Sequence, residues 1–390
     1  MNELLLSINN ILWHNTVLYL LLLTGIVFTI WTRFCQFKIL THGTKILKGH
    51  YDDENDPGAI NHFQALSAAL SATVGLGNIG GVAIAISLGG PGAVFWMWVV
   101  GFFGMSIKLT EVTLSMIYRN TKDKNNPHGG PMWVAKKGLE ELNPKLGLVG
   151  KAIGTLFCIT MLISTVTGGN MFQAWNVGEI TEEYFGIPSI ISGIILSLIV
   201  GIVIIGGIKR IGLVASRLVP TMVAIYLIAG SYVLFNNFHA IPNIFYLIIS
   251  SAFSTHEFSG AFIGGTAGYA FLIGMKRALF SNEAGQGTSP IAHSAAKTRE
   301  PVREGIVAGL EPFLDTIVVC TFTALVILST NIWNRAPEAT LIHLPEITSI
   351  NSNEWLIEDS TPSERINSKW KGGENIFMIV RASYNSQTGN

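Results

Sequence analysis

Long apolar runs occupy most of the first 330 residues and restrict the chain to a membrane fold. Eight of them are long enough to cross the roughly 30 Å hydrocarbon core of a bilayer. Because lipid offers the backbone no hydrogen-bond partners, such segments must satisfy their peptide groups internally, as helices do. We predict an all-α integral membrane domain over residues 1–330, with spans at about 16–36, 63–90, 92–117, 151–177, 188–208, 212–236, 244–274 and 304–329.

The distribution of positive charge supports this count and orients the spans. Of the 20 Lys and Arg residues up to position 330, Lys108 lies within a span and the others fall in four segments, at 33–48, 119–151, 209–217 and 276–303. Every second connection is therefore basic, as the positive-inside rule requires. We expect a multi-pass protein of the cell inner membrane with its N-terminus outside. The net charge of zero excludes a nucleic-acid partner.

Residues 331–390 differ in kind from the rest of the chain. They are polar and contain no apolar run near spanning length. After eight spans this part follows an outward-directed helix, and we predict that it is a polar extracytoplasmic segment.

The second span contains a run of glycines that a regular helix would not favour. Gly75, Gly77, Gly80 and Gly81 follow Thr73, and each glycine costs a helix about 1 kcal/mol relative to alanine. Broken backbone inside a bilayer is tolerated where it lines a cavity or is buried in protein. We predict a discontinuous helix whose free peptide groups bind a ligand; close packing of small residues between helices is the alternative.

The string GLGNIG in this span also matches the dinucleotide-binding fingerprint. No strand precedes it, and no acidic residue follows about 20 positions later to bind a ribose. We reject a nucleotide site on these grounds.

The seventh span has a second glycine-rich stretch, at residues 259–268. The second and seventh spans run in opposite directions and occupy corresponding positions in five-span halves. Paired interruptions of this kind are typical of secondary transporters with inverted repeats, in which the binding site lies near the bilayer midplane. The pattern therefore favours a transporter over a channel, which would need a continuous polar pore.

Several polar side chains lie within other spans. Asn170 and Gln173 share one face of the fourth span and form either a wall of the substrate site or hydrogen bonds between helices. Glu311 and Asp315 are one turn apart, so a cation, a proton or a basic residue must offset their repulsion. Their role, structural or ion-coupling, stays open.

Two further features have simple interpretations. Lys108 and Glu111 are three residues apart, which predicts an intrahelical ion pair. The segment 280–293 is dense in small and polar residues and is expected to be a cytoplasmic connection, with Glu283 and His293 as solvated gate contacts. Since no nucleophile–base or metal constellation is found, we expect neither an enzyme nor a cofactor.

Three segments resemble signature sequences of the alanine/glycine:cation symporter family of bacteria and archaea. They are ALSATVGLGNIGGVAIAISLGGPGAVFWMW, FSNEAGQGTSPIAHSAAKT and EPFLDTIVVCTFTALVI. The resemblance extends from about residue 15 to residue 330. It implies sodium-driven symport of alanine or glycine by alternating access, in a leucine-transporter-like inverted repeat with one additional N-terminal helix.

The resemblance also implies a site. Substrate contacts would fall on Thr73, Gly75, Gly77, Asn78, Phe172, Gln173, Phe262, Gly264 and Gly265. Cation coupling would involve Thr73, Asn78, Glu311 and Asp315, with sodium as the ion.

The family continues with about three more spans beyond the position equivalent to residue 330. We therefore expect that C-terminal helices missing from these 390 residues, or a partner chain, are needed for the full cycle. The other expected partners are a small amino acid, a sodium ion and the lipid bilayer. The main alternative is a proton-coupled amino-acid carrier of the same fold, with Glu311 or Asp315 carrying the proton; an ion channel is the weaker one.

Overall fold

The structure is a computed structural model that describes residues 14–253, 269–331 and 333, and the backbone of three short strands between residues 347 and 371. The chain divides into two compact units, Met1–Trp333 and Asn334–Asn390. The first unit is helical in its described part, and the second contains the strands. The glycine-rich stretch predicted at 259–268 lies outside the described residues.

The first unit consists of helices of very different length. In chain order they are α2 (Asn15–Trp31), α3 (Cys35–Leu47), α4 (His62–Thr73), α5 (Leu76–Gly89), α6 (Gly92–Tyr118), α7 (Pro131–Leu142), η1 (Pro144–Leu146), α8 (Gly147–Ser164), η2 (Thr165–Met171), α9 (Phe172–Phe185), α10 (Ser189–Ile204), α11 (Gly207–Asn236), η3 (Phe238–Ala240), α12 (Ile241–Ala252), α14 (Tyr269–Asn282), α15 (Thr288–His293), α16 (Pro301–Ala308), α17 (Leu310–Pro312), η4 (Phe313–Cys320) and α18 (Thr321–Ser329). The segments η2 and η4 are π-helical.

Apolar helices of spanning length confirm the membrane architecture. Among the described residues, four helical stretches are long and apolar enough to cross a bilayer, and two bent pairs raise that number to six. One pair is α2 with α3, at 75°, and the other is α4 with α5, at 42°. The predicted spans at 188–208 and 244–274 correspond to the shorter apolar helices Ser189–Ile204 and Phe238–Ala252. The count of eight spans and the inverted repeat stay predictions.

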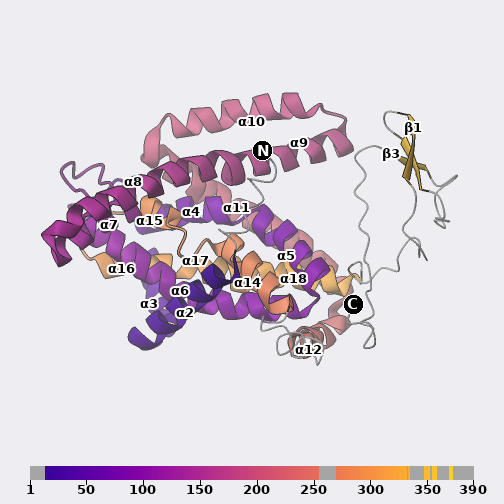
Figure 1. Cartoon of the computed structure of the whole chain (residues 1–390), viewed down its shortest axis with the longest axis horizontal. Coiled ribbons are helices and arrows are strands. Elements are labelled where there is room, and N and C mark those ends of the chain that lie inside the picture. The colour runs from indigo at the N-terminus through magenta and orange to yellow at the C-terminus, as the bar shows by residue number, and fades with distance from the viewer. Residues whose placement is uncertain are drawn as a thin grey trace. The chain divides into compact units, whose positions relative to one another are not determined.

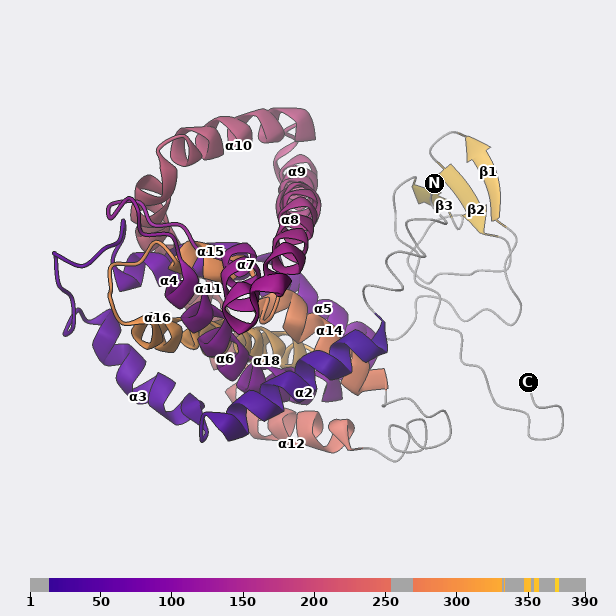
Figure 2. The ribbon, with the colours of Figure 1, turned by 60° about the vertical axis from the view of Figure 1, so that its left-hand side comes forward.

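Helix α6 lies at the centre of the first unit. It contacts α2, α5, α12, α14, α16 and η4, and both views show it surrounded by these helices (Figures 1 and 2). Small residues permit the close approach. A Cβ on Gly101 would lie 3.1 Å from Thr316 Cγ2, and one on Gly104 would lie 3.4 Å from Ala284 Cβ. The largest apolar core cluster, which includes Val82, Met97 and Met275, surrounds α6.

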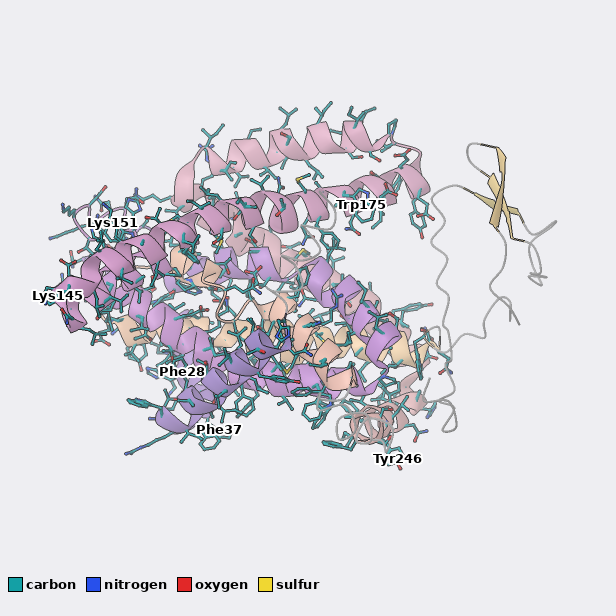
Figure 3. All side chains as sticks on the ribbon, in the orientation of Figure 1. Phe28, Phe37, Lys145, Lys151, Trp175 and Tyr246 are labelled. Atoms are coloured by element: carbon teal, nitrogen blue, oxygen red, sulfur yellow. The ribbon has the colours of Figure 1, made fainter. Side chains whose placement is uncertain are left out.

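Helices α8, α9 and α10 form an arm along one side of the unit (Figure 2). They contact α7, α11 and one another more than they contact the central helices. Large apolar side chains cover their outer surfaces; for example, Trp175 is 59% exposed and Leu198 is 63% exposed. Figure 3 shows Trp175 on this arm, with Phe37 and Tyr246 pointing outward from other helices. Such surfaces suit a lipid environment, where exposed apolar groups cost nothing.

The second unit contains a small antiparallel sheet. Strands β1 (Ile347–Asn351), β2 (Glu354–Ile357) and β3 (Lys369–Lys371) pair in the order β1-β2-β3. A register shift between Ser349 and Asn351 marks a bulge in the β1–β2 pair.

The close contact between α16 and α6 predicts that the fold tolerates a side chain at Gly305 poorly. A Cβ at Gly305 would lie 2.0 Å from Thr113 Oγ1 and 2.7 Å from the Leu109 carbonyl oxygen. We expect Gly305→Ala to lower stability by about 1–3 kcal/mol, because the backbone of α6 must move. The control is Gly201→Ala, at a position with no other atom within 4 Å. Thermal unfolding in detergent measures both, and equal midpoints would contradict the packing described here.

Candidate functional site

The first predicted interruption is present in the structure. Helix α4 ends at Thr73, Val74 is extended, and α5 begins at Leu76 after Gly75. The side-chain oxygen of Asn78 accepts a hydrogen bond of 2.7 Å from the Gly75 N–H. Asn78 therefore closes the start of α5 with its own amide and fixes the angle between the two half-helices.

The NH₂ group of Asn78 links the interruption to two other elements. It donates to Ser281 Oγ on α14 at 3.0 Å and to the Asp315 carbonyl oxygen on η4 at 3.2 Å. It also contacts the carboxylate of Asp315. Since Asn78 is fully buried, this one side chain joins three segments that are far apart in the sequence.

Two hydroxyl groups donate hydrogen bonds to the carboxylate of Asp315. Ser281 Oγ donates to it at 2.7 Å and Thr316 Oγ1 at 2.8 Å. Asp315 is completely buried, and none of the ion pairs among the described residues includes it. A buried carboxylate surrounded by neutral donors is costly unless a cation or a proton balances it.

Thr73 is the nearby group with an unused hydrogen-bonding atom. Its Oγ1 is buried and has no partner, although threonine hydroxyls within helices usually bond to a carbonyl one turn earlier. Buried polar atoms without partners are rare and often indicate a ligand. Thr73 occupies the last turn of α4, directly before the interruption.

A second interruption lies where the sequence analysis did not expect one. Helix α14 ends at Asn282 and α15 begins at Thr288; between them Glu283, Gly285 and Gly287 all have positive φ. Ser281, Asn282 and His293 are completely buried. The interpretation of His293 as a solvated contact is therefore wrong, whereas Glu283 is partly exposed. Buried polar groups of the segment pair with one another and with η4, as in the 3.1 Å bond from Asn282 Nδ2 to Thr316 Oγ1.

A signal for this second interruption was present in the sequence. Ser71-x-x-x-Gly75-x-Gly77 at the first interruption recurs as Ser281-x-x-x-Gly285-x-Gly287 at the second. In both places a glycine of the motif is the N-cap of a new helix: Gly75, the first glycine, precedes α5, and Gly287, the second glycine, precedes α15. The short motif was overlooked because the apolar run ends before it and lysine and arginine precede it.

The predicted substrate residues of α5 and α9 lie close together. A Cβ on Gly75 would lie 3.8 Å from Gln173 Oε1, and one on Gly77 would lie 3.4 Å from Ser281 Cα and 3.7 Å from the Phe280 ring. Phe280 in turn meets Phe172 edge to face, with ring centroids 6.4 Å apart. The other three predicted contacts, Phe262, Gly264 and Gly265, lie outside the described residues.

Glu311 has different neighbours from Asp315. Its carboxylate lies 3.2 Å from Lys108 Nζ and 2.7 Å from His293 Nε2, and it accepts a hydrogen bond from Ser289. Lys108 is 3.7 Å from Glu111, so the predicted Lys108–Glu111 pair exists but is the longer of two. The structure thus separates the two carboxylates that the sequence analysis treated together.

These features define a class of protein. Helices of spanning length, one of them interrupted at a buried cluster of polar groups, are typical of membrane transporters. The comparison with known proteins is specific: the chain belongs to the sodium:alanine symporter family, whose family model matches residues 1–350. The resemblance found in the sequence is confirmed, and membership points to a transporter rather than an enzyme.

Curated relatives cover most of the chain. It is 44% identical over 321 residues to the sodium/alanine symporter AgcS of Methanococcus maripaludis, covering 82% of this chain and 69% of that protein. It is 32% identical over 382 residues to the probable sodium/glutamine symporter GlnT of Bacillus subtilis, covering 98% and 74%. A third relative, the putative sodium/proton-dependent alanine carrier YrbD of B. subtilis, is 37% identical over 334 residues, covering 86% and 66%.

The hydrogen bonds of Asn78 predict a large effect on folding. Asn78→Ala leaves the Gly75 N–H without its acceptor and removes the amide's hydrogen bonds to Ser281 and Asp315, and we expect a loss of about 1–3 kcal/mol. The matched control is Asn176→Ala, since the Asn176 amide bonds only to the Phe172 carbonyl of its own helix. Chemical unfolding in detergent, followed by tryptophan fluorescence, compares the two. A variant at position 78 that is as stable as the control would contradict the assigned role.

Proposed function

We propose that the protein is a secondary transporter that couples sodium entry to the uptake of a small neutral amino acid, alanine or glycine, by alternating access. The observation that carries the proposal is the buried cluster of Asn78, Ser281 and Asp315, which joins two interrupted helices. Family membership supports it, as do relatives whose names specify sodium with alanine or glutamine.

We propose the cation site at this cluster. Asp315 supplies a carboxylate that no cationic side chain balances, and Ser281 and Thr73 add hydroxyl oxygens. Carbonyls freed where α4 ends at Thr73 complete an all-oxygen environment, which suits a hard cation such as sodium. Asn78 orients Asp315 through its NH₂ group. Glu311 is left out of the proposed ligand set, because Lys108 and His293 already neutralise it.

We propose the amino-acid site beside the cation site. The N-terminal end of α5 offers peptide N–H groups and a partial positive charge to the substrate carboxylate. Gly75 and Gly77 leave room for a small side chain, since larger residues there would meet Gln173 and Phe280. The Phe172–Phe280 pair would cover the bound substrate. Phe262, Gly264 and Gly265 stay predicted contacts.

The architecture that we propose remains an eight-span, leucine-transporter-like inverted repeat in the cell inner membrane, with the N-terminus outside and residues 331–390 extracytoplasmic. The paired interruptions predicted from the sequence, in the spans 63–90 and 244–274, stay a proposal; the interruption at 283–287, which shares the Ser-x-x-x-Gly-x-Gly motif with the one at 74–75, is a second candidate for the partner interruption. The need for additional C-terminal helices or a partner chain stays an expectation.

Proton coupling is the second candidate. A proton on Asp315 would balance its charge as a sodium ion would, and one relative is described as a putative sodium/proton-dependent carrier. The ion is decided by measuring alanine and glycine uptake into proteoliposomes with an imposed sodium gradient or an imposed proton gradient. Uptake driven equally by the proton gradient alone would overturn the sodium assignment.

The carboxylate of Asp315 is expected to set the sodium dependence. Asp315→Asn keeps the shape of the side chain and removes its charge. We expect half-maximal uptake to require at least about tenfold more sodium. A contact with a charged group contributes about 1.5–3 kcal/mol, and the loss of that energy weakens sodium binding at least about tenfold. Asp123→Asn, in the loop that follows α6, serves as the control. Unchanged sodium dependence would remove Asp315 from the site.

A substitution at Thr73 can separate an effect on sodium binding from an effect on protein stability. Thr73→Val removes an oxygen that has no hydrogen-bond partner among the described residues, so thermal stability should hold or rise while the affinity for sodium falls. Thr323→Val is the matched control, because that buried hydroxyl bonds to the Val319 carbonyl and to Tyr226. If both variants keep wild-type sodium affinity, Thr73 is not a ligand.

A further inference from the structure

A second buried polar cluster lies outside the proposed transport site. It consists of five side chains from five elements, which we call the histidine–carboxylate network: His62 on α4, Lys108 on α6, His293 on α15, Glu304 on α16 and Glu311 on α17. Each is at most 1% exposed. Nothing in the proposed binding of sodium or substrate uses them.

The contacts in this network form one continuous chain. His62 Nδ1 contacts one oxygen of Glu304, and the other oxygen lies 2.5 Å from His293 Nδ1. His293 Nε2 lies 2.7 Å from Glu311 Oε1, and Glu311 Oε2 lies 3.2 Å from Lys108 Nζ. Acidic and basic groups alternate along the whole chain.

The geometry of His293 requires a proton. Both of its ring nitrogens lie within hydrogen-bond distance of carboxylate oxygens. A neutral imidazole has one N–H and one acceptor nitrogen, and an acceptor cannot face an ionised carboxylate. Either the ring carries two protons, or one of Glu304 and Glu311 is protonated. In both cases the three groups share one proton more than a neutral histidine with two carboxylates would hold.

The charge count leads to the same result. With Lys108 and His293 positive and Glu304 and Glu311 negative, the completely buried part of the network is neutral. Loss of the shared proton leaves one uncompensated negative charge with no access to water, which is strongly unfavourable. The occupancy of this proton is therefore tied to how tightly the surrounding helices pack.

One end of the network has a route to solvent. His62 Nε2 is buried without a hydrogen-bond partner and lies 3.8 Å from Asp52 Oδ1, and the Asp52 side chain is 45% exposed. Asp52 belongs to the connection between α3 and α4. The charge pattern predicts that this connection is cytoplasmic, which would place the His62 nitrogen at the cytoplasmic end of the network.

We infer that the histidine–carboxylate network is a proton-binding site, distinct from the cation site, that exchanges its proton with the cytoplasm through His62. His62 takes a proton at Nε2 and releases the one on Nδ1 to Glu304, and rotation of that carboxyl group delivers it to His293 Nδ1. Charge is conserved at each transfer. The other ionisable groups around this chain are Asp52, Glu111, Arg119, Glu283 and Asp315, the last of which interacts with Lys108.

The bound proton has a mechanical consequence. His62 is the first residue of α4, and its contact with Glu304 ties the beginning of that helix to α16. If α4 moves during the transport cycle, this contact must open. Loss of the shared proton leaves an unprotonated nitrogen of His293 facing a carboxylate and one uncompensated negative charge on Glu304 and Glu311, which would loosen the packing of α16 to which α4 is tied. Cytoplasmic pH would then control how firmly the inner half of the interrupted helix is closed.

The direct test observes the histidine itself. Purified full-length protein with ¹⁵N-labelled histidine is measured by NMR between pH 6 and pH 9, and the signal of His293 is identified by its loss in His293→Gln. We expect a doubly protonated ring at pH 8, where a free histidine, which titrates near about 6.5, is neutral. A singly protonated ring at pH 6, with the side-chain carboxyl signals of Glu304 and Glu311 both showing the ionised form in ¹³C-labelled protein, would overturn the proposal, and this result does not depend on any transport activity.

The functional test compares two glutamates on neighbouring turns. Glu304→Gln keeps the hydrogen-bonding shape but removes one of the two charges that hold the proton, whereas Glu300 is 71% exposed and Glu300→Gln is the matched control. Sodium-driven uptake is measured at a fixed gradient with the same pH on both sides. This arm rests on the proposed function.

We expect wild-type uptake to stay level through neutral pH and to fall in the alkaline range, with the Glu300→Gln profile unchanged. In Glu304→Gln the fall should occur at least about one pH unit lower, the scale on which one nearby opposite charge acts. If uptake by Glu304→Gln is reduced by the same factor at every pH, the role of Glu304 is purely structural and the proposal is overturned. Absence of any sodium-driven uptake in the wild type would instead refute the proposed function.

Discussion

The amide of Asn78 is the interaction on which the arrangement of the central helices depends. Its oxygen holds the first peptide of α5, and its nitrogen holds α14 and η4. An asparagine can do this because it has both acceptor and donor atoms in one short, uncharged group. A carboxylate at this position could not donate to Asp315, and an apolar residue would leave the broken backbone without partners. The hydrogen bonds of Asn78 to the surrounding segments therefore stabilise the interruption.

The molecule places its two groups of buried charges in different electrical environments. Glu311 is neutralised within the protein by Lys108 and His293, whereas Asp315 is surrounded by neutral amide and hydroxyl donors. Both residues lie on one helical segment, one turn apart. The first arrangement is complete without a ligand, and the second requires a positive charge from outside. This contrast is the physical basis for placing the cation at Asp315.

The π-helical segments lie next to residues of the proposed binding sites. Asp315 belongs to η4, and the predicted residue Phe172 follows η2 directly. A π-helical turn widens the helix and leaves some backbone groups less well paired, which is why such turns are frequent at functional sites. At η4 the carbonyl and the carboxylate of Asp315 both contact Asn78.

Much of the architecture follows from the sequence alone, because lipid leaves an apolar run of about 20 residues no alternative to a helix. The first interruption was predictable for the same reason, since Gly75 and Gly77 stand in the middle of such a run. The second was not predicted at 283–287, because its small polar residues resemble a loop unless Ser281, Gly285 and Gly287 are aligned with the first motif. The number of spans stays a prediction from the hydropathy pattern and the distribution of charge.

The partners of the buried charges were decided only by the tertiary structure. Sequence spacing predicts an ion pair between Lys108 and Glu111 and repulsion between Glu311 and Asp315, because spacing identifies only neighbours on the same helix. The fold brings Lys108 and His293 to Glu311, and Asn78 and Ser281 to Asp315, across more than 200 positions of chain in the case of Asn78 and Lys108. Residues on one turn of a helix can face opposite sides of a packed core, so only the arrangement of the surrounding helices determines which carboxylate has cationic partners, as Glu311 does, and which has none among the described residues, as Asp315 does.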